Sequence, residues 1–389
     1  MTSRDVLVIN CGSSSLKFAV IEPQSGHVGH HGLAERLGTP QADWVMDDAP
    51  SEALPEGADH GAALDRILER VSGDRILAVG HRVVHGGERF SESVLLDDAV
   101  VTQIDACTPL APLHNPANLL GIREARARFP KLPQVAVFDT AFHHGMPPKA
   151  FHYAVPYELY ERHGVRRYGF HGTSHRFVAE EAAKRLGRPL SDTMLVTAHL
   201  GNGCSACAIS GGKSVDTTMG LTPLEGLVMG TRSGDVDPNL HEFLAKQSGL
   251  DLPQISELLN KKSGLLGLSG ESNDMRELLE SRDRGSARAA LAIDVFCHRL
   301  AKAVLGSCAG LERVDALVFT GGIGEHAAPV RAQTLSELRL LGARLDEALN
   351  AAHGRESNGR ITHTDSGLLA LVIPTNEERV IAREAARFL

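Results

Sequence analysis

VLVINCGSSSLKFAV, residues 6–20, is the stretch of the sequence that decides the fold. Its first four residues are apolar and rich in β-branched side chains, and so short a run is typical of a buried strand. Residues 10–15 are turn formers, Gly12 can adopt a positive φ, and the apolar character returns at Leu16. The stretch predicts a hairpin whose tip offers hydroxyls, backbone N–H groups and the Lys17 ammonium, which together suit a polyanion. Taken alone, it is equally typical of an ordinary serine-rich hairpin.

Two later stretches have a similar design. Residues 194–209, MLVTAHLGNGCSACAI, predict an apolar strand, an Asn-Gly turn and a returning strand of small residues. Residues 316–325, ALVFTGGIGE, predict a strand that opens into a glycine loop, followed by a helix. A backbone with several glycines can approach a phosphate closely, so this loop is a second candidate for nucleotide contact.

The repetition indicates a duplicated nucleotide-binding domain. We expect an α/β fold of two duplicated actin-like ATPase (ribonuclease H-like) domains with an interdomain cleft, as in sugar kinases and chaperone ATPases. Prolines and aromatic residues between positions 146 and 160 mark the expected crossing from one domain to the next. The expected N-terminal domain comprises residues 1–147 with 375–389, and the expected nucleotide-binding domain comprises residues 148–374.

Composition excludes some classes of function. The chain has 389 residues, 42% of them hydrophobic, and a formal net charge of −8, without the basic stripe of a nucleic-acid binder. We expect no membrane partner, because no basic and apolar leader opens the chain and no apolar run is long enough to span a bilayer. The 6 cysteines are scattered, which favours a reducing cytoplasm. Cys204 and Cys207 form C-x-x-C, but inside a predicted strand, where a structural role is favoured.

Two arginines beside glycines are candidates for anion binding. Arg82 follows a predicted strand in GHRVVHGG, residues 80–87, and Arg232 is the one arginine of the glycine-spaced loop at residues 222–235. His81 and His85 have a spacing that suits a metal on a helix, but their surroundings predict a strand and a loop. A third anion-friendly loop, RRYGFHGTSH at residues 166–175, precedes a predicted helix.

Three carboxylates have two interpretations each. Asp139 ends a buried strand, where ligand chemistry tends to lie in α/β proteins, but it could equally cap a helix. Glu377 and Glu378 open the last helix, where the helix dipole favours them. One of them could instead hold Mg²⁺ near the first hairpin if that helix packs there.

The chain resembles the acetate kinase family over nearly its whole length. The motifs that carry the resemblance occur in the order of the family: VINCGSSSLKF, GHRVVHGG, APLHNP, VFDTAFH, RYGFHGTSH, HLGNG, TPLEGLVMGTRSGD, FTGGIGE and PTNEE. The resemblance implies the reaction ATP + acetate ⇌ ADP + acetyl phosphate with Mg²⁺, for which Mn²⁺ can substitute, in a homodimer. Other short-chain carboxylates, propionate first, are the alternative substrates.

The resemblance also implies residue roles. The catalytic positions are Asp139, His171 and Arg232. The substrate positions are Arg82, Val84, Leu113, Phe170 and Pro223, and the metal positions are Asn10 and Glu377. The nucleotide positions are Ser13, Ser15, Lys17, His199, Leu200, Gly201, Asn202, Gly203, Asp274, Met275, Arg276, Gly322, Ile323, Gly324, Glu325 and His326. Many relatives carry Asn where this chain has His326, which leaves the contact of that residue with the nucleotide open.

The chemistry agrees with this inventory. A carboxylate that attacks a phosphate brings two anions together, and two arginines, a lysine, a histidine and Mg²⁺ offset the repulsion. No strong general base is required because the carboxylate is already ionised at neutral pH. We therefore expect Asp139 to orient Arg232 or the metal shell. Two other functions on this fold are disfavoured. A chaperone-like ATPase would need a separate peptide-binding segment, and the two expected domains already occupy the 389 residues. A sensor that binds acyl phosphate without turnover should lack Arg82, Arg232 or His171, and all three are present.

Overall fold

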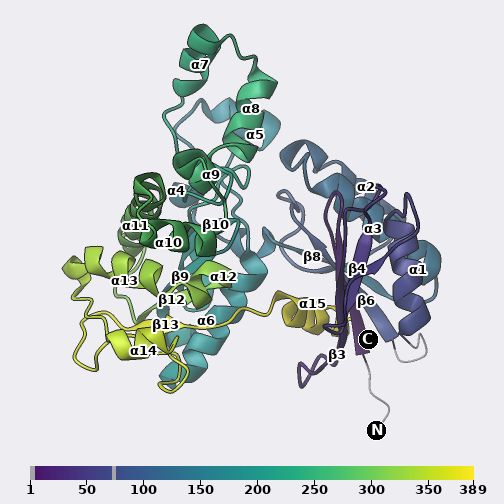
Figure 1. The fold of residues 1–389 in the computed structure, drawn as a ribbon. Coiled ribbons are helices and arrows are strands. Elements are labelled where there is room, and N and C mark those ends of the chain that lie inside the picture. Colours follow the sequence, from purple (N-terminus) through teal and green to yellow (C-terminus); the bar gives the residue numbers. More distant parts are fainter. Residues whose placement is uncertain (1–4, 72–75) are drawn as a thin grey trace. The chain divides into compact units, whose positions relative to one another are not determined.

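The computed structural model describes residues 5–71 and 76–389 (Figure 1). The first four residues of the expected N-terminal domain, and residues 72–75, lie outside the described residues. The chain forms two compact units. Unit 1 contains the chain up to His144 and the segment Asn376–Leu389, and unit 2 contains Gly145–Thr375.

Unit 1 is built on a mixed sheet with the strand order β5-β4-β3-β2-β1-β6-β8-β7. Its strands are β1 (Asp5–Cys11), β2 (Leu16–Ile21), β3 (Val28–Glu35), β4 (Asp43–Met46), β5 (Glu52–Ala53), β6 (Ile76–Val83), β7 (Val94–Leu95) and β8 (Gln134–Phe138). Its helices are α1 (His60–Arg70), α2 (Asp98–Asp105), α3 (Asn115–Arg128) and α15 (Glu377–Ala386). The strands β1, β6 and β8 run parallel to one another, so their carboxyl ends share one edge of the sheet.

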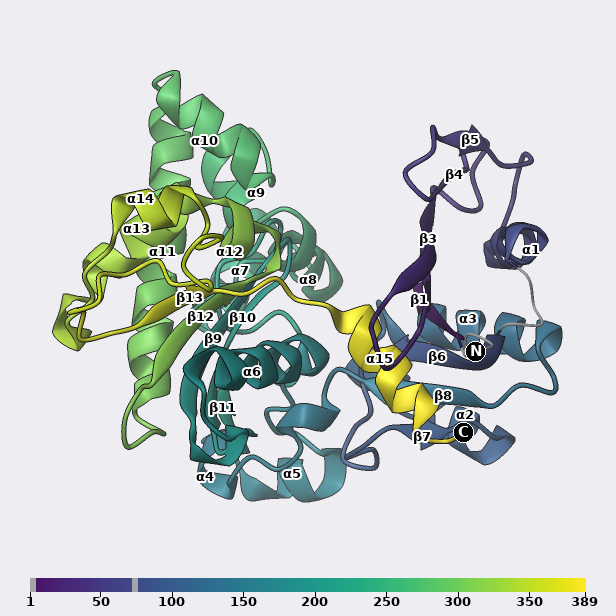
Figure 2. The ribbon, with the colours of Figure 1, turned by 90° about the horizontal axis from the view of Figure 1, so that it is seen from below.

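The first hairpin forms as the sequence predicts. Strands β1 and β2 pair antiparallel from Val6↔Ile21 to Cys11↔Leu16, and the turn closes with a hydrogen bond from Gly12 N to Ser15 O of 2.8 Å. Both faces of β1 are buried, in two different clusters. Side chains of α1 pack in the cluster on one face and side chains of α15 in the cluster on the other, so the last helix of the chain covers the first strand (Figure 2).

Unit 2 has a sheet with the strand order β11-β10-β9-β12-β13. Its strands are β9 (Met194–Leu200), β10 (Cys204–Ser210), β11 (Lys213–Thr217), β12 (Ala316–Thr320) and β13 (Ala370–Val372). Its helices are α4 (Pro148–Phe151), α5 (Tyr157–His163), α6 (Gly172–Leu186), α7 (Leu240–Ser248), α8 (Leu252–Lys261), α9 (Gly264–Ser269), α10 (Met275–Asp283), α11 (Ala287–Cys308), α12 (Gly321–His326), α13 (Ala328–Glu337) and α14 (Glu347–Ala351). Helices α6 and α11 both pack on the sheet. The predicted Asn-Gly hairpin is the β9–β10 pair, joined at residues 201–203.

One expectation about local structure is wrong. The glycine stretch after β12 is the short helix α12 and not an open loop, because Gly321, with φ of +74°, turns the chain directly from the strand into the helix. A Cβ at Gly321 would lie 2.7 Å from the carbonyl oxygen of Leu200, so only glycine allows this close approach.

All six cysteines are free thiols, and Cys204 and Cys207 are buried in β10 as the structural interpretation predicts. Burial raises the pKa of the Cys204 and Cys207 thiols to about 12. Among the described residues, no helix is both long and apolar enough to cross a membrane.

Candidate active site

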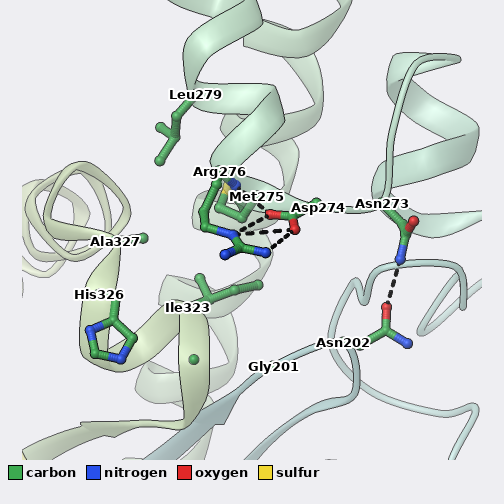
Figure 3. A pocket seen from close by; sticks show the side chains of 11 residues that line it. Gly201, Asn202, Asn273, Asp274, Met275, Arg276, Leu279, Ile323, His326 and Ala327 are labelled. Carbon is green, nitrogen blue, oxygen red and sulfur yellow. Dashed lines mark hydrogen bonds and ion pairs between the residues drawn. The ribbon is translucent and has the colours of Figure 1, made fainter. Parts of the chain in front are cut away.

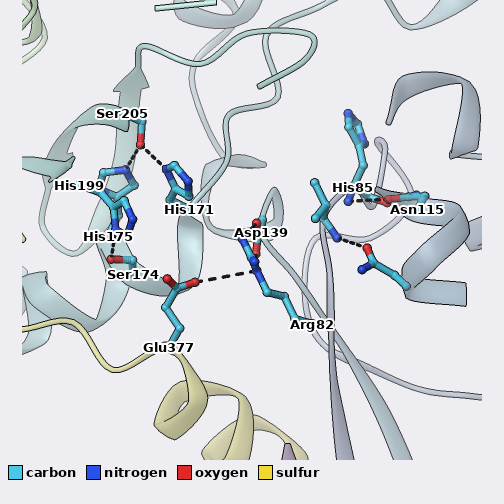
Figure 4. A network of polar contacts seen from close by, with 12 residues as sticks. Arg82, His85, Asn115, Asp139, His171, Ser174, His175, His199, Ser205 and Glu377 are labelled. Carbon is cyan, nitrogen blue, oxygen red and sulfur yellow. Dashed lines mark hydrogen bonds and ion pairs between the residues drawn. The ribbon is translucent and has the colours of Figure 1, made fainter. Parts of the chain in front are cut away.

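In unit 1, an arginine and a carboxylate meet at the carboxyl edge of two neighbouring strands. Arg82 is near the end of β6, and Asp139 follows β8 directly. The guanidinium donates two hydrogen bonds to the carboxylate, from Nε to Oδ1 at 3.0 Å and from Nη2 to Oδ2 at 2.7 Å (Figure 4). This bidentate geometry fixes the plane of the guanidinium. The expected role of Asp139 is to orient Arg232 or the metal shell. Within unit 1 the carboxylate pairs with Arg82, and its relation to Arg232, a residue of unit 2, stays a prediction.

Electrostatics in this part of unit 1 favour a charged arginine. Burial alone would lower the pKa of Arg82, but the charges of Asp139 and Glu377 outweigh it and raise that pKa above its ordinary value. Glu377 Oε2 lies 3.9 Å from Arg82 Nε. The Asp139 side chain is only 1% exposed, and this burial raises its pKa against the opposing effect of Arg82. Arg82 keeps 22% of its side chain exposed, so a bound anion can reach it.

The hairpin tip and the start of α15 lie together. Asn10 pairs with Lys17 across the β1–β2 ladder, and the Lys17 ammonium forms an ion pair with Glu378. Ser13 is exposed and Ser15 is partly exposed, so their hydroxyls can reach a ligand in the solvent. Glu377, next to Glu378, is the first residue of α15.

These oxygens fit a magnesium ion that also binds phosphates. The described residues contain no group of three or more His, Cys, Asp and Glu side chains that could hold a metal by themselves. Mg²⁺ usually takes one or two protein carboxylates, keeps several waters and binds phosphate oxygens. One carboxylate at Glu377 and one amide oxygen at Asn10 are a donor set of that kind.

The expected walls of the acyl pocket divide between the units. Val84 and Leu113 belong to unit 1, where Val84 is 8% exposed and Leu113 is 55% exposed. Phe170 and Pro223 belong to unit 2, where Phe170 is buried and the Pro223 carbonyl accepts a hydrogen bond of 2.6 Å from Arg232 Nη1. The composition of this pocket therefore stays a prediction.

In unit 2, two groups that can carry positive charge meet at the turn of the second hairpin. His171 precedes α6 with φ of 56°, a left-handed conformation that is rare for a residue with a side chain. Its ring stacks on that of His199, with centroids 4.3 Å apart. A Cβ added at Gly203 would lie 2.7 Å from Arg232 Nη2 and 3.3 Å from His171 Nε2. Gly203 therefore leaves the space in which these two side chains approach each other.

A chain of hydrogen bonds lies behind this histidine. Ser205 Oγ bonds His171 Nδ1 at 2.9 Å and His175 Nε2 at 2.8 Å (Figure 4). Ser174 Oγ bonds His199 Nδ1 at 2.8 Å. Neither serine is predicted as a site residue, because a serine in a strand of small residues, or in the first turn of a helix, has no pattern of its own.

A pocket of about 460 Å³ lies in unit 2 (Figure 3). Its lining residues are Gly201, Asn202, Asn273, Asp274, Met275, Arg276, Leu279, Gly322, Ile323, His326 and Ala327. Asp274 caps α10 and forms an ion pair with Arg276, and Asn273 donates to Asn202 Oδ1 at 3.1 Å. The pocket is mixed in chemistry, since both apolar and polar groups line it.

Most of the expected nucleotide positions of unit 2 line this pocket, but not all. Five do not: His199, Leu200, Gly203, Gly324 and Glu325. Glu325 instead accepts hydrogen bonds from the backbone N–H groups of Gly321 and Thr375 and so supports the glycine helix. Asn273, Leu279 and Ala327 line the pocket and were not expected. Ser13, Ser15 and Lys17 belong to unit 1.

Comparison with known proteins places this geometry in a family. A family model described as the Acetokinase family matches residues 5–383. The chain is 55% identical to an acetate kinase of Ectopseudomonas mendocina, over 100% of both chains, and 57% identical to one of Deinococcus radiodurans, over 98% and 97%. A propionate kinase structure from Francisella tularensis aligns with a TM-score of 0.93 and 46% identity, covering 98% of this chain and 99% of that chain. A Porphyromonas gingivalis acetate kinase structure aligns with a TM-score of 0.91 and 42% identity, covering 98% and 99%.

These similarities show the class of protein. The fold is the two-domain actin-like ATPase fold, and the enzyme is a phosphotransferase whose acceptor is a carboxylate. The chain belongs to the acetate kinase (Acetokinase) family.

Proposed function

We propose that the chain catalyses ATP + acetate ⇌ ADP + acetyl phosphate by direct attack of a carboxylate oxygen on the γ-phosphorus. The P–O bond to that carboxylate oxygen forms as the bond from the γ-phosphorus to the β,γ-bridging oxygen breaks, and ADP leaves with the bond's electron pair. The observation that carries the proposal is the approach of Arg232 and His171 across Gly203, in the turn whose first two residues line the pocket of unit 2. A nucleotide base in that pocket would bring its phosphates near these two side chains.

In the proposed reaction, the protein lowers the barrier mainly by placing positive charge around the reacting anions. Two unit charges of like sign at ~4 Å repel by roughly 4 kcal/mol at an effective dielectric constant of about 20. Arg82 would neutralise the acetate carboxylate, and Arg232 and His171 would stabilise the charge on the transferring phosphoryl group. Asp139 keeps the guanidinium of Arg82 in one plane, so the substrate does not have to order it.

The nucleotide phosphates would use the first hairpin. Ser13, Ser15 and Lys17 present hydroxyls and an ammonium at its tip, and Lys17 would exchange its ion pair with Glu378 for one with a phosphate. Asn10 and Glu377 would hold Mg²⁺ there, with Mn²⁺ as a substitute. When bound, the ion supplies charge neutralisation at the phosphate oxygens.

Acetate is the proposed acceptor because relatives at 55% and 57% identity are acetate kinases. Propionate is the second candidate, since a structure that aligns with a TM-score of 0.93 is a propionate kinase. One additional methylene gains about 0.8 kcal/mol by burial but costs about 1–3 kcal/mol if the pocket is already filled. Bulky walls at Val84 and Phe170 would therefore favour acetate by a modest factor, and butyrate would be poor.

The test is a hydroxamate assay with purified protein, ATP, Mg²⁺ and a series of acetate, propionate and butyrate. We expect the highest kcat/KM with acetate, and a relative gain for propionate in Val84→Ala. Equal or better efficiency with butyrate would contradict the acetate assignment. Absence of hydroxamate with all three acids would contradict the proposed reaction.

We propose that the enzyme works as a homodimer in the cytoplasm. The six cysteines are all free, and five of them are buried, which supports a reducing compartment. The mass of the chain is 41.6 kDa, so light scattering should give twice this value for the purified protein, and the monomer mass would contradict the dimer.

A further inference from the structure

The hydroxyl of Ser205 joins two histidine rings in unit 2. It lies 2.9 Å from His171 Nδ1 and 2.8 Å from His175 Nε2, and the Ser205 side chain is fully buried. The chain of contacts continues from His175 Nδ1 to Thr197 Oγ1 at 2.7 Å. Three secondary-structure elements therefore supply one buried line of polar atoms: α6 with the residue before it, β9 and β10.

The contact of Thr197 at the far end of this line indicates which atom donates in each hydrogen bond. Thr197 Oγ1 is placed to donate to the carbonyl oxygen of Cys207, at 3.5 Å, and a carbonyl can only accept. A threonine hydroxyl has one proton, so Thr197 accepts from His175, which then carries its proton on Nδ1. His175 Nε2 is left as an acceptor for the Ser205 proton. Ser205, having donated its one proton, accepts from His171 Nδ1–H.

From this order we infer that Ser205, His175 and Thr197 are positioning residues for His171. They hold the neutral imidazole with its proton on Nδ1, and Nε2 on the side of Gly203 and Arg232. The inference rests on the proposed function for its catalytic meaning: with Nδ1–H bonded to Ser205, Nε2 is the nitrogen that takes up a second proton, and the imidazolium so formed donates to the phosphoryl group.

The geometry around His171 explains why such a device is useful. The residue has φ of 56°, and its ring stacks on that of His199, a contact that does not distinguish the two ring nitrogens. An imidazole held only by stacking could turn over and present Nδ1 instead. The hydrogen bond to Ser205 excludes that orientation, because it commits Nδ1 to the interior of the unit.

The first experiment is kinetic and uses Ser205→Ala, with Ser214→Ala as the matched control. Ser214 is also a buried serine of this sheet, on β11, and its hydroxyl lies 3.3 Å from Cys207 Sγ. We expect Ser205→Ala to lower kcat by roughly ten- to hundredfold with KM for acetate and ATP within about twofold, because the ring loses its orientation after the substrates bind. Ser214→Ala should keep the wild-type kcat. Wild-type kcat in Ser205→Ala would overturn the inference.

The second experiment needs no turnover and detects the proton directly. Long-range ¹H–¹⁵N correlation spectra of histidine-labelled protein distinguish the two neutral tautomers of His171, assigned with a His171→Gln variant. In the wild type we expect the proton on Nδ1. In Thr197→Val, a change at the far end of the chain of hydrogen bonds, His175 loses its acceptor, so the order of donors should reverse and His171 should shift towards the Nε2–H tautomer. A wild-type proton on Nε2, or an unchanged His171 tautomer in Thr197→Val, would overturn the inference. If instead the wild type fails to phosphorylate acetate, the proposed function fails and the tautomer result stands.

Discussion

The carboxylate of Asp139 accepts two hydrogen bonds from the guanidinium of Arg82, which fixes the plane of that arginine at the end of β6. In Asp139→Asn one acceptor oxygen becomes an amide donor, so one of these bonds is lost and the guanidinium can turn. A guanidinium out of its plane no longer donates to the acetate carboxylate as proposed. We predict that kcat/KM for acetate falls roughly a hundredfold, since loss of one placed donor commonly costs this much. KM for ATP should change little.

The matched control for this variant is Asp65→Asn. Asp65 accepts a similar pair of bonds from Arg128, at 2.6 and 2.9 Å, between α1 and α3 on the surface of unit 1. Its kinetics should equal those of the wild type. Near-normal use of acetate by Asp139→Asn would show that the orientation of Arg82 is not important for turnover.

Arg232→Ala should lower kcat by roughly a hundredfold or more while KM for ATP changes much less, because in the proposed reaction the planar guanidinium stabilises the transferring phosphoryl group. Arg232→Lys should recover only part of the loss, since an ammonium cannot reproduce two parallel donors. Steady-state kinetics at saturating substrates measure both. Turnover close to that of the wild type in Arg232→Ala would remove Arg232 from the catalytic set.

Gly203→Ala should reduce kcat without reducing thermal stability. The new Cβ would lie 2.7 Å from Arg232 Nη2, the flexible end of a side chain, so the guanidinium moves and the backbone does not. Gly306→Ala in α11 is the control, since a Cβ there has no neighbour within 4 Å and alanine favours the helix by about 0.5–1 kcal/mol. If Gly203→Ala has wild-type kcat, Arg232 and His171 do not need their close approach.

The buried His81 should make unit 1 sensitive to acid. Burial lowers the pKa of His81 from 6.5 to about 4, and its ring bonds Gln134 Oε1 at 2.8 Å. As the pH falls below 6.5, this histidine takes up a proton in the unfolded chain but stays neutral in the folded protein until the pH approaches 4. The free energy of unfolding is therefore unaffected by this group above pH 6.5 and falls as the pH drops from 6.5 towards 4. Between pH 7 and pH 5 the loss from this one group is roughly 2 kcal/mol.

The variant His81→Gln removes the contribution of this histidine to the pH dependence of the free energy of unfolding. Trp44, the one tryptophan of the sequence, is buried in unit 1, so its fluorescence during denaturant unfolding reports on that unit. The free energy of unfolding of the wild type minus that of His81→Gln should shrink from pH 7 to pH 5. A difference that stays constant or grows would mean that His81 is charged in the folded protein.

The sequence predicts the local parts of this fold well. Strands β1 and β2 follow from a short apolar run and a block of turn formers, and the turn between β9 and β10 follows from Asn-Gly. Helix α12 was missed because its three glycines have a low helix propensity, which the packing of Gly321 against the backbone of Leu200 overrides.

Partnerships between distant residues could not be predicted. Asp139 is found at the end of a strand by pattern alone, but its partner depends on β8 lying beside β6 in the sheet. Ser205 gives no signal in the sequence, because its contacts appear only when α6, β9 and β10 are assembled. Arg82 and His171, which these partners hold in place, are candidate site residues because of the resemblance to the family. The variants described above test them.

Direct transfer to a carboxylate oxygen is the central claim, and isotope-shifted ³¹P NMR tests it most directly. The enzyme is given ATP, Mg²⁺ and acetate labelled with ¹⁸O in both oxygens. If a carboxylate oxygen attacks the γ-phosphorus, the products are ADP and acetyl phosphate whose phosphorus signal carries the shift of one ¹⁸O in the bridging position. Formation of AMP, or acetyl phosphate with an unshifted phosphorus signal, would contradict the account.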